Sequence, residues 1–165
     1  MKLVILDRDG VINFDSDHFI KSPAEWKAIP GSLEAIARLN QAGFKVVIAT
    51  NQSGIGRGLF DMDTLNAIHE KMHRAAQAVG ARVDAIFYCP HAAASKCDCR
   101  KPKPGMIQKA MAEWQGEPAT SFLIGDKDSD MEAAAADGIQ GFLFTGGNLL
   151  EFVEKPILPQ KSVMK

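Results

Sequence analysis

The chain has 165 residues, of which 46% are hydrophobic and 24% are charged. This composition is typical of a globular domain and excludes a disordered, collagen-like or coiled-coil chain. With 19 Lys and Arg against 20 Asp and Glu, the formal net charge of -1 provides no global positive field for a nucleic-acid backbone or an anionic membrane. The early hydrophobic run, residues 3–6, is too short for a signal peptide, and no run reaches the roughly 18 residues of a membrane helix. We expect a cytoplasmic, single-domain protein.

Short β-rich runs alternate with helical patterns along the chain. Hydrophobic runs predict strands over residues 3–6, 44–49, 85–88, 122–124 and 141–144. Hydrophobic residues at helical spacing predict helices around residues 33–39, 65–79, 107–111 and 131–135, and Asp61 is expected to cap the second of these. Alternation of this kind indicates parallel strands joined by right-handed crossovers. The predicted fold is therefore α/β, a three-layer Rossmann-like domain whose ligand site lies beyond the carboxyl ends of the strands.

The end of the chain differs in composition from the rest. Residues 155–165 contain Pro156, Pro159 and three lysines, which is typical of a loosely held terminus. We expect a folded domain over residues 1–154 and a tail over residues 155–165 that carries no chemistry.

Two carboxylates follow the first predicted strand. Residues i and i+2 of an extended segment point the same way, so Asp7 and Asp9 can face one reacting centre. Gly10 allows the chain to turn sharply around a ligand. Taken alone, this motif is equally compatible with a polar turn after a strand.

Polar residues also follow other predicted strands. Thr50 to Gly54 follow the second strand with a hydroxyl and two amides, and Asp126 to Asp130 follow the fourth with further carboxylates. Between them, residues 100–105 supply cations. Acids to bind a metal, together with cations and a hydroxyl to bind an anion, predict a phosphate-processing site.

The three cysteines cluster between positions 89 and 99. An odd number of cysteines beside a histidine favours a metal site in a reducing compartment over a disulfide framework. Three thiolates and one imidazole complete a tetrahedral set for Zn²⁺ and leave no open position, so we expect a structural zinc loop. The expected ligands are Cys89, His91, Cys97 and Cys99. The alternative is a chance cluster of loop cysteines.

Together these motifs resemble those of the haloacid dehalogenase superfamily. Asp7-Arg-Asp9-Gly-Val, Thr50, Lys101 and Gly125-Asp126 with Asp130 match its four ordered motifs, over residues 3–144. Within that span, the sequences at 50–54 (TNQSG), 89–91 (CPH), 97–102 (CDCRKP) and 125–127 (GDK) resemble the histidinol-phosphatase and heptose-bisphosphate phosphatase branch. The resemblance implies hydrolysis of a phosphomonoester with Mg²⁺ as cofactor. Members often carry a cap domain, but the motif spacing leaves no room for one, so we expect an open site.

The resemblance also implies catalytic roles. Asp7 would be the nucleophile that forms an aspartyl-phosphate, and Asp9 would protonate the leaving oxygen and then activate water. Thr50 and Lys101 would bind the transferring phosphoryl group. Mg²⁺ would be held by the carboxylates of Asp7 and Asp126 and the backbone carbonyl of Asp9.

Substrate contacts are expected around this centre, and Asp130 is expected to orient Lys127 or a metal-bound water. The resemblance implies the 7-phosphate of a heptose 1,7-bisphosphate, a lipopolysaccharide-core precursor, as substrate of a monomeric enzyme. Heptose-specific members tend to read Asp-x-Gly-Tyr-Val where this chain has residues 15–20 (DSDHFI), so histidinol phosphate or another sugar phosphate stays an alternative. The expected substrate-binding residues are Asp15, Asp17, His18, Asn51, Gln52, Ser53, Arg100 and Lys127.

Two features of the sequence are also compatible with other functional classes. His69-Glu70-x-x-His73 matches a zinc-protease motif, but both histidines flank an apolar helical stripe, and His91, the plausible third ligand, is claimed by the cysteines. Helix-border histidines are the favoured interpretation. A nucleic-acid end-processing module would share much of the phosphatase chemistry, but the net charge of -1 argues against it, and no nucleic-acid partner is expected.

Overall fold

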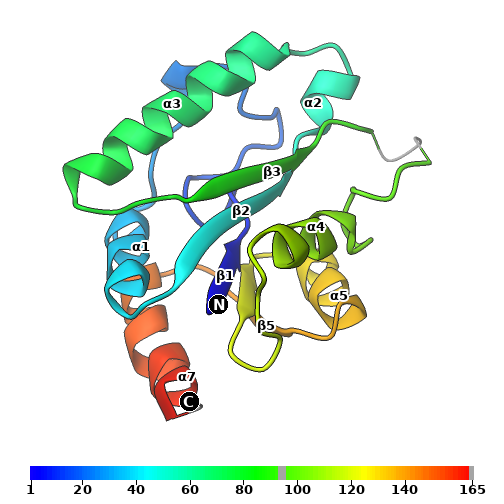
Figure 1. The fold of residues 1–165 in the computed structure, drawn as a ribbon. Helices are drawn as coiled ribbons and strands as arrows, with labels where there is room; N and C mark the ends of the chain where they lie inside the picture. The colour runs from blue at the N-terminus through cyan, green and yellow to red at the C-terminus, as the bar shows by residue number, and fades with distance from the viewer. Residues whose placement is uncertain (93–95, 164–165) are drawn as a thin grey trace.

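A computed structural model of the chain describes residues 1–92 and 96–163. Its strands form a single parallel sheet in the order β3-β2-β1-β4-β5 (Figure 1). The strands are β1 (Leu3–Leu6), β2 (Lys45–Asn51), β3 (Ala85–Cys89), β4 (Phe122–Gly125) and β5 (Gln140–Leu143). The predicted parallel sheet is confirmed, and the predicted strand ends differ from these bounds by at most two residues.

Helices cover both faces of the sheet, as the alternating pattern predicted. On one face lie α1 (Ser32–Gln41) and α3 (Met62–Ala78), and on the other lie α4 (Gly105–Glu113) and α5 (Asp128–Ala136) (Figure 1). Asp61 caps α3 by accepting a hydrogen bond from Thr64 N at 2.9 Å, as predicted. The shorter elements are η1 (Pro23–Glu25), α2 (Ser53–Gly56), α6 (Leu149–Phe152), the π-helical turn η2 (Val153–Ile157) and α7 (Leu158–Val163).

The central strand β1 is buried on both of its faces. Val4 and Leu6 pack into the core under α1 and α3, whereas Leu3 and Ile5 pack into the core under α4 and α5. Because successive side chains of a strand point to opposite faces, a continuous apolar run is needed to fill two cores at once. Burial of this strand fixes the position of the polar residues that follow it.

The end of the chain differs from its prediction. Ile157 and Leu158 are 0% and 4% exposed and belong to the same core as Leu149 and Val153. Three of these residues recur every four positions, the spacing of one helical face, but Pro156 within the segment obscured that pattern in the sequence. The expectation of a loosely held tail from residue 155 is therefore wrong for the part that reaches Leu158, and the domain extends beyond residue 154. Residues 164–165 of the predicted tail lie outside the described residues.

The segments between the strands contain no cap domain in the described ranges. Between β1 and α1 the chain forms η1 and two isolated bridges, and between β2 and α3 it forms α2. This agrees with the predicted absence of a cap. Of the described helices, none combines the length and the apolar character needed to cross a membrane.

Candidate active site

Three strand ends bring the predicted catalytic residues together. Asp7 follows β1, Thr50 is the next-to-last residue of β2, and Asp126 follows β4. β1 lies between β2 and β4 in the sheet. The connection from β1 to β2 passes through α1 on one face of the sheet, whereas the helix that precedes β4, α4, lies on the opposite face. In an α/β sheet, ligands bind at such a switch of strand order, beyond the carboxyl ends of the strands.

A buried ammonium group stands beside Asp7. Lys101 is 4% exposed, and its Nζ lies 3.2 Å from Asp7 Oδ1 and 2.6 Å from Asp130 Oδ1. The same Nζ donates to the carbonyl of Ala49 at 2.8 Å. Burial lowers the pKa of Lys101, but the Asp7 and Asp130 carboxylates raise it by more, so its pKa lies above the ordinary value. The site therefore keeps a fixed positive charge next to Asp7.

Asp130 has a side-chain partner, Lys101, besides the predicted Lys127. It bonds the Lys101 ammonium, whereas the Lys127 ammonium lies 3.3 Å from Asp15 Oδ2 and 3.8 Å from Asp126 Oδ2. Only the backbone N–H of Lys127 reaches Asp130, at 3.2 Å from Oδ2. Lys127 is the N-cap of α5, so Asp130 in the first turn points back toward its backbone while the Lys127 side chain points outward. The predicted link between Asp130 and Lys127 thus runs through the Lys127 backbone, and a contact of Asp130 with a metal-bound water stays a prediction.

Carboxylates crowd the centre of the site. Oxygens of Asp7, Asp126 and Asp130 lie within 4.8 Å of one another. Burial raises the pKa of Asp7 to about 8; Lys101 opposes this shift, and the neighbouring carboxylates, including Asp9, add to it. In the absence of a cation, Asp7 therefore holds a proton at neutral pH.

The oxygens around Asp126 are suited to a hard cation. Asp126 Oδ1 is buried and has no hydrogen-bond partner among the described residues. Gly10 has a φ of 86°, and a Cβ at this position would overlap the Asp126 carboxylate, so only glycine lets the chain pass this closely. Burial raises the pKa of Asp126, against the opposing charge of Lys127. An unpartnered carboxylate oxygen among other carboxylates fits Mg²⁺, which prefers oxygen ligands.

Asp9 is held on both of its oxygens. Its Oδ1 accepts hydrogen bonds from Arg8 Nε at 2.8 Å and Asn13 Nδ2 at 3.0 Å, and its Oδ2 accepts from Gln52 Nε2 at 3.3 Å. Burial raises the pKa of Asp9, but Arg8 and these hydrogen bonds lower it by more, so the net shift is downward. The carboxylate is thus ionised and oriented. The motifs did not predict the supporting roles of Arg8 and Asn13, although an arginine between two acids was a visible signal.

Gln52 lies beneath the site. It is 3% exposed, and its amide also donates to Thr50 Oγ1 at 2.9 Å. The structure thus places Gln52 as a support for Asp9 and Thr50, apart from the residues that line the open cavity. Asn51, by contrast, both lines the cavity and accepts a hydrogen bond from Lys101 N at 3.1 Å, which ties the Lys101 loop to β2.

An open cavity of about 500 Å³ lies over these groups. Five of the predicted substrate-binding residues line it, from the segments that follow β1, β2, β3 and β4. The lining residues are Asp9, Asp15, Ser16, Phe19, Asn51, Ser53, Arg100, Lys101, Pro102, Lys127 and Ser129. Asp17 and His18 are exposed and are not among these residues, because the chain turns there: Ser16 Oγ accepts from His18 N, and Lys21 Nζ donates to the His18 carbonyl.

The predicted zinc ligands converge at the end of β3. Cys89 Sγ lies 3.7 Å from Cys97 Sγ and 3.6 Å from His91 Nδ1, which lies 3.3 Å from Cys99 Sγ. Tetrahedral Zn²⁺ with ordinary bond lengths would separate two sulfurs by about 3.8 Å and a sulfur from a nitrogen by about 3.5 Å. The donor set and these three separations therefore fit zinc, whereas the sulfurs of Cys89 and Cys99 would have to separate to bind it. Residues 93–95 of the predicted loop lie outside the described residues.

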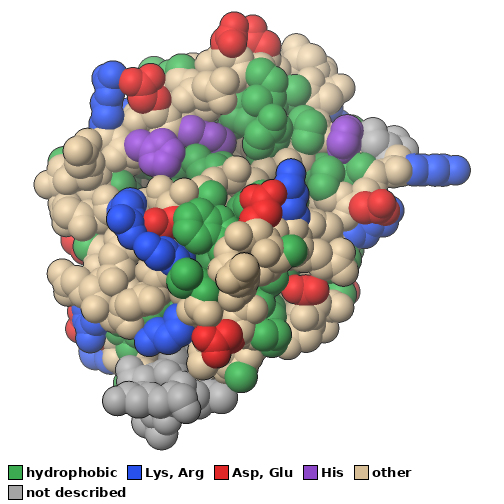
Figure 2. Space-filling view, viewed as in Figure 1, with side chains coloured by type: hydrophobic (Ala, Val, Ile, Leu, Met, Phe, Trp, Pro, Cys, Tyr) green, Lys and Arg blue, Asp and Glu red, His purple; other side chains and the backbone are tan. Residues whose placement is uncertain are grey.

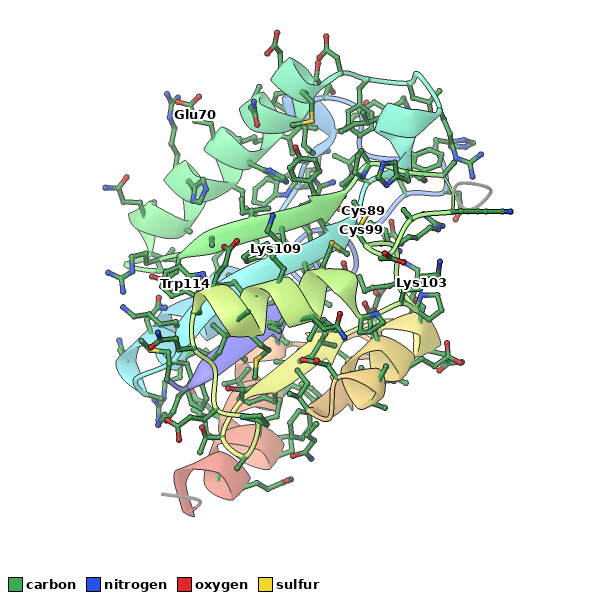
Figure 3. The ribbon with its side chains drawn as sticks, turned by 45° about the vertical axis from the view of Figure 1, so that its right-hand side comes forward. Glu70, Cys89, Cys99, Lys103, Lys109 and Trp114 are labelled. Carbon is green, nitrogen blue, oxygen red and sulfur yellow. A yellow bond between two sulfur atoms is a disulfide. The ribbon has the colours of Figure 1, made fainter. Side chains whose placement is uncertain are left out.

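The structure also contains a disulfide within this cluster. Cys89 and Cys99 are bonded, side by side at the end of β3, and Cys97 is a free thiol (Figure 3). The sequence favoured a metal site over a disulfide, so the bond is a departure from that expectation. A disulfide and a zinc thiolate set are alternative states of the same sulfur atoms.

Neither interpretation from another functional class gains support from the geometry. His69 Nε2 lies 3.1 Å from Arg8 Nη1, and in the described residues neither His69 nor His73 belongs to a cluster able to hold a metal. This agrees with the prediction that both histidines flank the apolar stripe of the helix and bind no metal. Figure 2 shows basic and acidic side chains interspersed over the viewed face, unlike the basic stripe of a nucleic-acid-binding surface.

Comparison with known proteins identifies the family. The model of the haloacid dehalogenase-like hydrolases matches residues 6–138, most of the chain. The chain belongs to this family. The resemblance noted in the sequence is thereby confirmed, and the protein is a hydrolase.

Several relatives of this hydrolase carry one name. The D-glycero-beta-D-manno-heptose-1,7-bisphosphate 7-phosphatase of Bordetella bronchiseptica is 54% identical over 160 residues, which cover 97% of this chain and 89% of the relative. The enzyme of that name from Pseudomonas putida is 47% identical over 157 residues, covering 95% and 90%. A crystal structure of the D,D-heptose 1,7-bisphosphate phosphatase from B. bronchiseptica, complexed with magnesium and phosphate, matches with a TM-score of 0.86 and 57% identity, covering 90% of this chain and 83% of that one.

Proposed function

We propose that this hydrolase is a magnesium-dependent phosphatase that removes the 7-phosphate of D-glycero-beta-D-manno-heptose 1,7-bisphosphate. The observation that carries the proposal is the pairing of a buried carboxylate, Asp7, with the fixed ammonium of Lys101 under an open cavity. The names of relatives at up to 54% identity support the choice of substrate. With this substrate, the protein acts as a monomer in the cytoplasm and contributes to the heptose precursors of lipopolysaccharide.

The residues that would hold Mg²⁺ are Asp7 and Asp126, through their carboxylates, and Asp9, through its backbone carbonyl. The unpartnered Oδ1 of Asp126 supports this assignment. When bound, Mg²⁺ supplies positive charge that offsets the repulsion between Asp7 and an anionic phosphate.

The reaction proceeds in two displacements. Asp9 is ionised before substrate binds and takes up the proton of the phosphate monoanion as the substrate enters. An Asp7 oxygen then attacks phosphorus while Asp9 passes this proton to the departing sugar oxygen, which leaves an aspartyl-phosphate on Asp7. Asp9, now ionised, takes a proton from water, and the resulting hydroxide attacks phosphorus, so that phosphate leaves and Asp7 is regenerated. Lys101 and Thr50 stabilise the negative charge that builds on the phosphoryl oxygens.

The charge of the cavity wall favours a bisphosphate over histidinol phosphate. Arg100 and Lys127 line the cavity, and Arg100 forms no salt bridge among the described residues; its Nη1 donates only to the His91 carbonyl at 3.3 Å. A free guanidinium can bind a second phosphate group. The carboxylates that line the cavity are already paired, Asp15 with Lys127 at 3.3 Å and Asp9 with Arg8 at 2.8 Å, so the amine of histidinol phosphate would have to compete with these cations.

Phosphate release with Mg²⁺ tests the proposal. The substrates compared are both anomers of the heptose bisphosphate, histidinol phosphate and fructose 1,6-bisphosphate. The β-anomer of the heptose bisphosphate is expected to react fastest, Asp7→Asn to be inactive, and Asp17→Asn, an exposed acid outside the cavity lining, to keep wild-type activity. Equal turnover by Asp7→Asn and the wild type, or a preference for histidinol phosphate, would contradict the proposal.

A structural zinc ion on Cys89, His91, Cys97 and Cys99 is the second part of the proposal. The donor spacing supports it, and the loop leads directly into Arg100 and Lys101, so zinc would hold both cations toward the phosphate. Metal analysis of protein purified under reducing conditions should find one zinc per chain, lost in Cys97→Ser. A zinc-free wild type with an intact Cys89–Cys99 disulfide would refute the metal site. Full activity of metal-depleted Cys99→Ser would refute the link to the phosphate.

A further inference from the structure

Arg8 forms a buried bridge between α3 and the carboxylate of Asp9. Its side chain is fully buried, with Nε 2.8 Å from Asp9 Oδ1 and Nη1 3.1 Å from His69 Nε2. The remaining nitrogen, Nη2, has no hydrogen-bond partner among the described residues. In the described part of the chain, His69 is thus the one hydrogen-bond partner on the far side of the guanidinium.

The protonation state of His69 follows from this contact. A guanidinium has only donors, so His69 Nε2 must accept, and the ring must be neutral with its proton on Nδ1. Burial, with further contributions from Arg8 and His73, lowers the pKa of His69 to about 3. The ring therefore stays an acceptor throughout the neutral range.

We propose that His69 is a positioning residue for the reaction: its neutral imidazole fixes the guanidinium of Arg8, which in turn holds the Asp9 carboxylate toward the leaving group. This inference rests on the proposed phosphatase function. Two acceptors on different nitrogens define both the position and the plane of a rigid, planar guanidinium. The zinc-protease-like pattern around His69 thus contains a residue that serves the phosphatase site.

Loss of the His69 acceptor would propagate to Asp9. Arg8 Nη1 would be buried without a partner, and an unsatisfied buried donor drives rearrangement. Movement of the guanidinium would displace its bond to Asp9 Oδ1, while Asn13 and Gln52 would hold the carboxylate only in part. We therefore expect impaired general-acid catalysis with the nucleophile Asp7 intact.

Leaving-group dependence distinguishes this role from a general structural one. An alkoxide leaving group needs a proton from Asp9, whereas the p-nitrophenolate of p-nitrophenyl phosphate departs without one. A positioned general acid contributes about 10²–10⁴-fold, so its partial misalignment should cost about 10-fold or more. For His69→Leu, we expect kcat/KM to fall by about this factor with the heptose bisphosphate and by less than about threefold with p-nitrophenyl phosphate.

Two further variants complete the experiment. His69→Gln places an amide oxygen near the lost nitrogen and should recover most of the activity on the sugar phosphate. His73→Leu removes an exposed histidine one turn along α3 and should match the wild type. Equal losses on both substrates, no loss on either, or no recovery in His69→Gln would overturn the proposal.

Failure of the phosphatase assignment would be recognised separately. In that case the wild type itself would release no phosphate from either ester. Crystal structures of the wild type and His69→Leu would then decide the positioning role alone. A shifted Asp9 carboxylate in the variant is expected, and retention of the Arg8–Asp9 contact in its original position would overturn the inference.

Discussion

Replacing Asp7 with Asn should stabilise the magnesium-free protein increasingly as the pH rises. Asp7 is buried beside other carboxylates, which raises its pKa from 3.8 to about 8. Asn keeps an Oδ1 acceptor for Arg8 N, which lies 2.9 Å from Asp7 Oδ1, and removes the titrating proton. The comparison therefore isolates the cost of ionising a carboxyl group in this site.

The magnitude follows from proton linkage. Between about pH 4 and 8 the folded wild type holds a proton on Asp7 that the unfolded chain has released, so its stability falls as the pH rises. The slope is about 1.4 kcal/mol per pH unit, or about 2.7 kcal/mol between pH 5 and pH 7. Asp126, whose pKa is also raised, adds a slope of the same sign in both proteins. Asp9, whose pKa is lowered, has the opposite slope, but that slope lies below the ordinary carboxyl pKa and outside this window.

Urea unfolding at pH 5, 6 and 7 measures this difference. The buffer should lack both magnesium and chelator, because a chelator would also extract zinc. The free energy of unfolding of Asp7→Asn, relative to that of the wild type, is expected to increase at each step in pH. That of Asp17→Asn should change with pH as the wild type does. Saturating Mg²⁺ should then stabilise the wild type more than Asp7→Asn. Parallel stability curves for the wild type and Asp7→Asn across this range would refute the reasoning.

Three substitutions test other parts of the structure. Lys71 Nζ donates to the carbonyls of Pro23 and Trp26 at 2.7 Å each. Lys71→Met should therefore lower the free energy of unfolding in urea by about 1–2 kcal/mol without loss of Mg²⁺ affinity. An unchanged unfolding midpoint would contradict this prediction. Gly10→Ala should weaken Mg²⁺ binding about 10-fold or more, or about 1.4 kcal/mol, as measured by calorimetry, because its methyl group would displace the Asp126 carboxylate. Wild-type affinity in this variant would refute the close packing of Gly10 against Asp126. Ile157→Ala should lower the free energy of unfolding by about 2–5 kcal/mol, because Ile157 is fully buried. An unchanged free energy of unfolding would show that this segment is loosely held.

The fold and the centre of the site could be predicted because both depend on local order in the chain. A strand buried on two faces must be a continuous apolar run, and the first polar residues after it lie at the open edge of the sheet. Asp7, Thr50 and Asp126 were found in this way. Their convergence depends only on the strands being parallel and adjacent.

The supporting contacts could not be predicted because they depend on packing between distant segments. Arg8 and His69 meet because α3 packs over the loop after β1, which no spacing within the chain reveals. Asp130 turned toward Lys101 because the first turn of α5 fixes its direction. The buried Ile157 was hidden by the proline that precedes it. In each case the residue type was visible and its partner was not.

Charge balance at the site predicts that magnesium binding releases a proton. Asp7 and Asp130 flank the buried ammonium of Lys101, and Asp126 lies close to both acids with the exposed Lys127 ammonium 3.8 Å away. Full ionisation of the three acids therefore leaves an excess of negative charge that a divalent cation would offset. Without the cation, Asp7 keeps its proton at neutral pH because its pKa is about 8. Mg²⁺ must displace that proton to bind the carboxylate. Calorimetry at pH 7 in buffers of different ionisation enthalpy should therefore report release of close to one proton per Mg²⁺, and much less at pH 9. Binding heats that do not depend on the buffer at pH 7 would show that Asp7 is already ionised and that the cluster tolerates its excess charge.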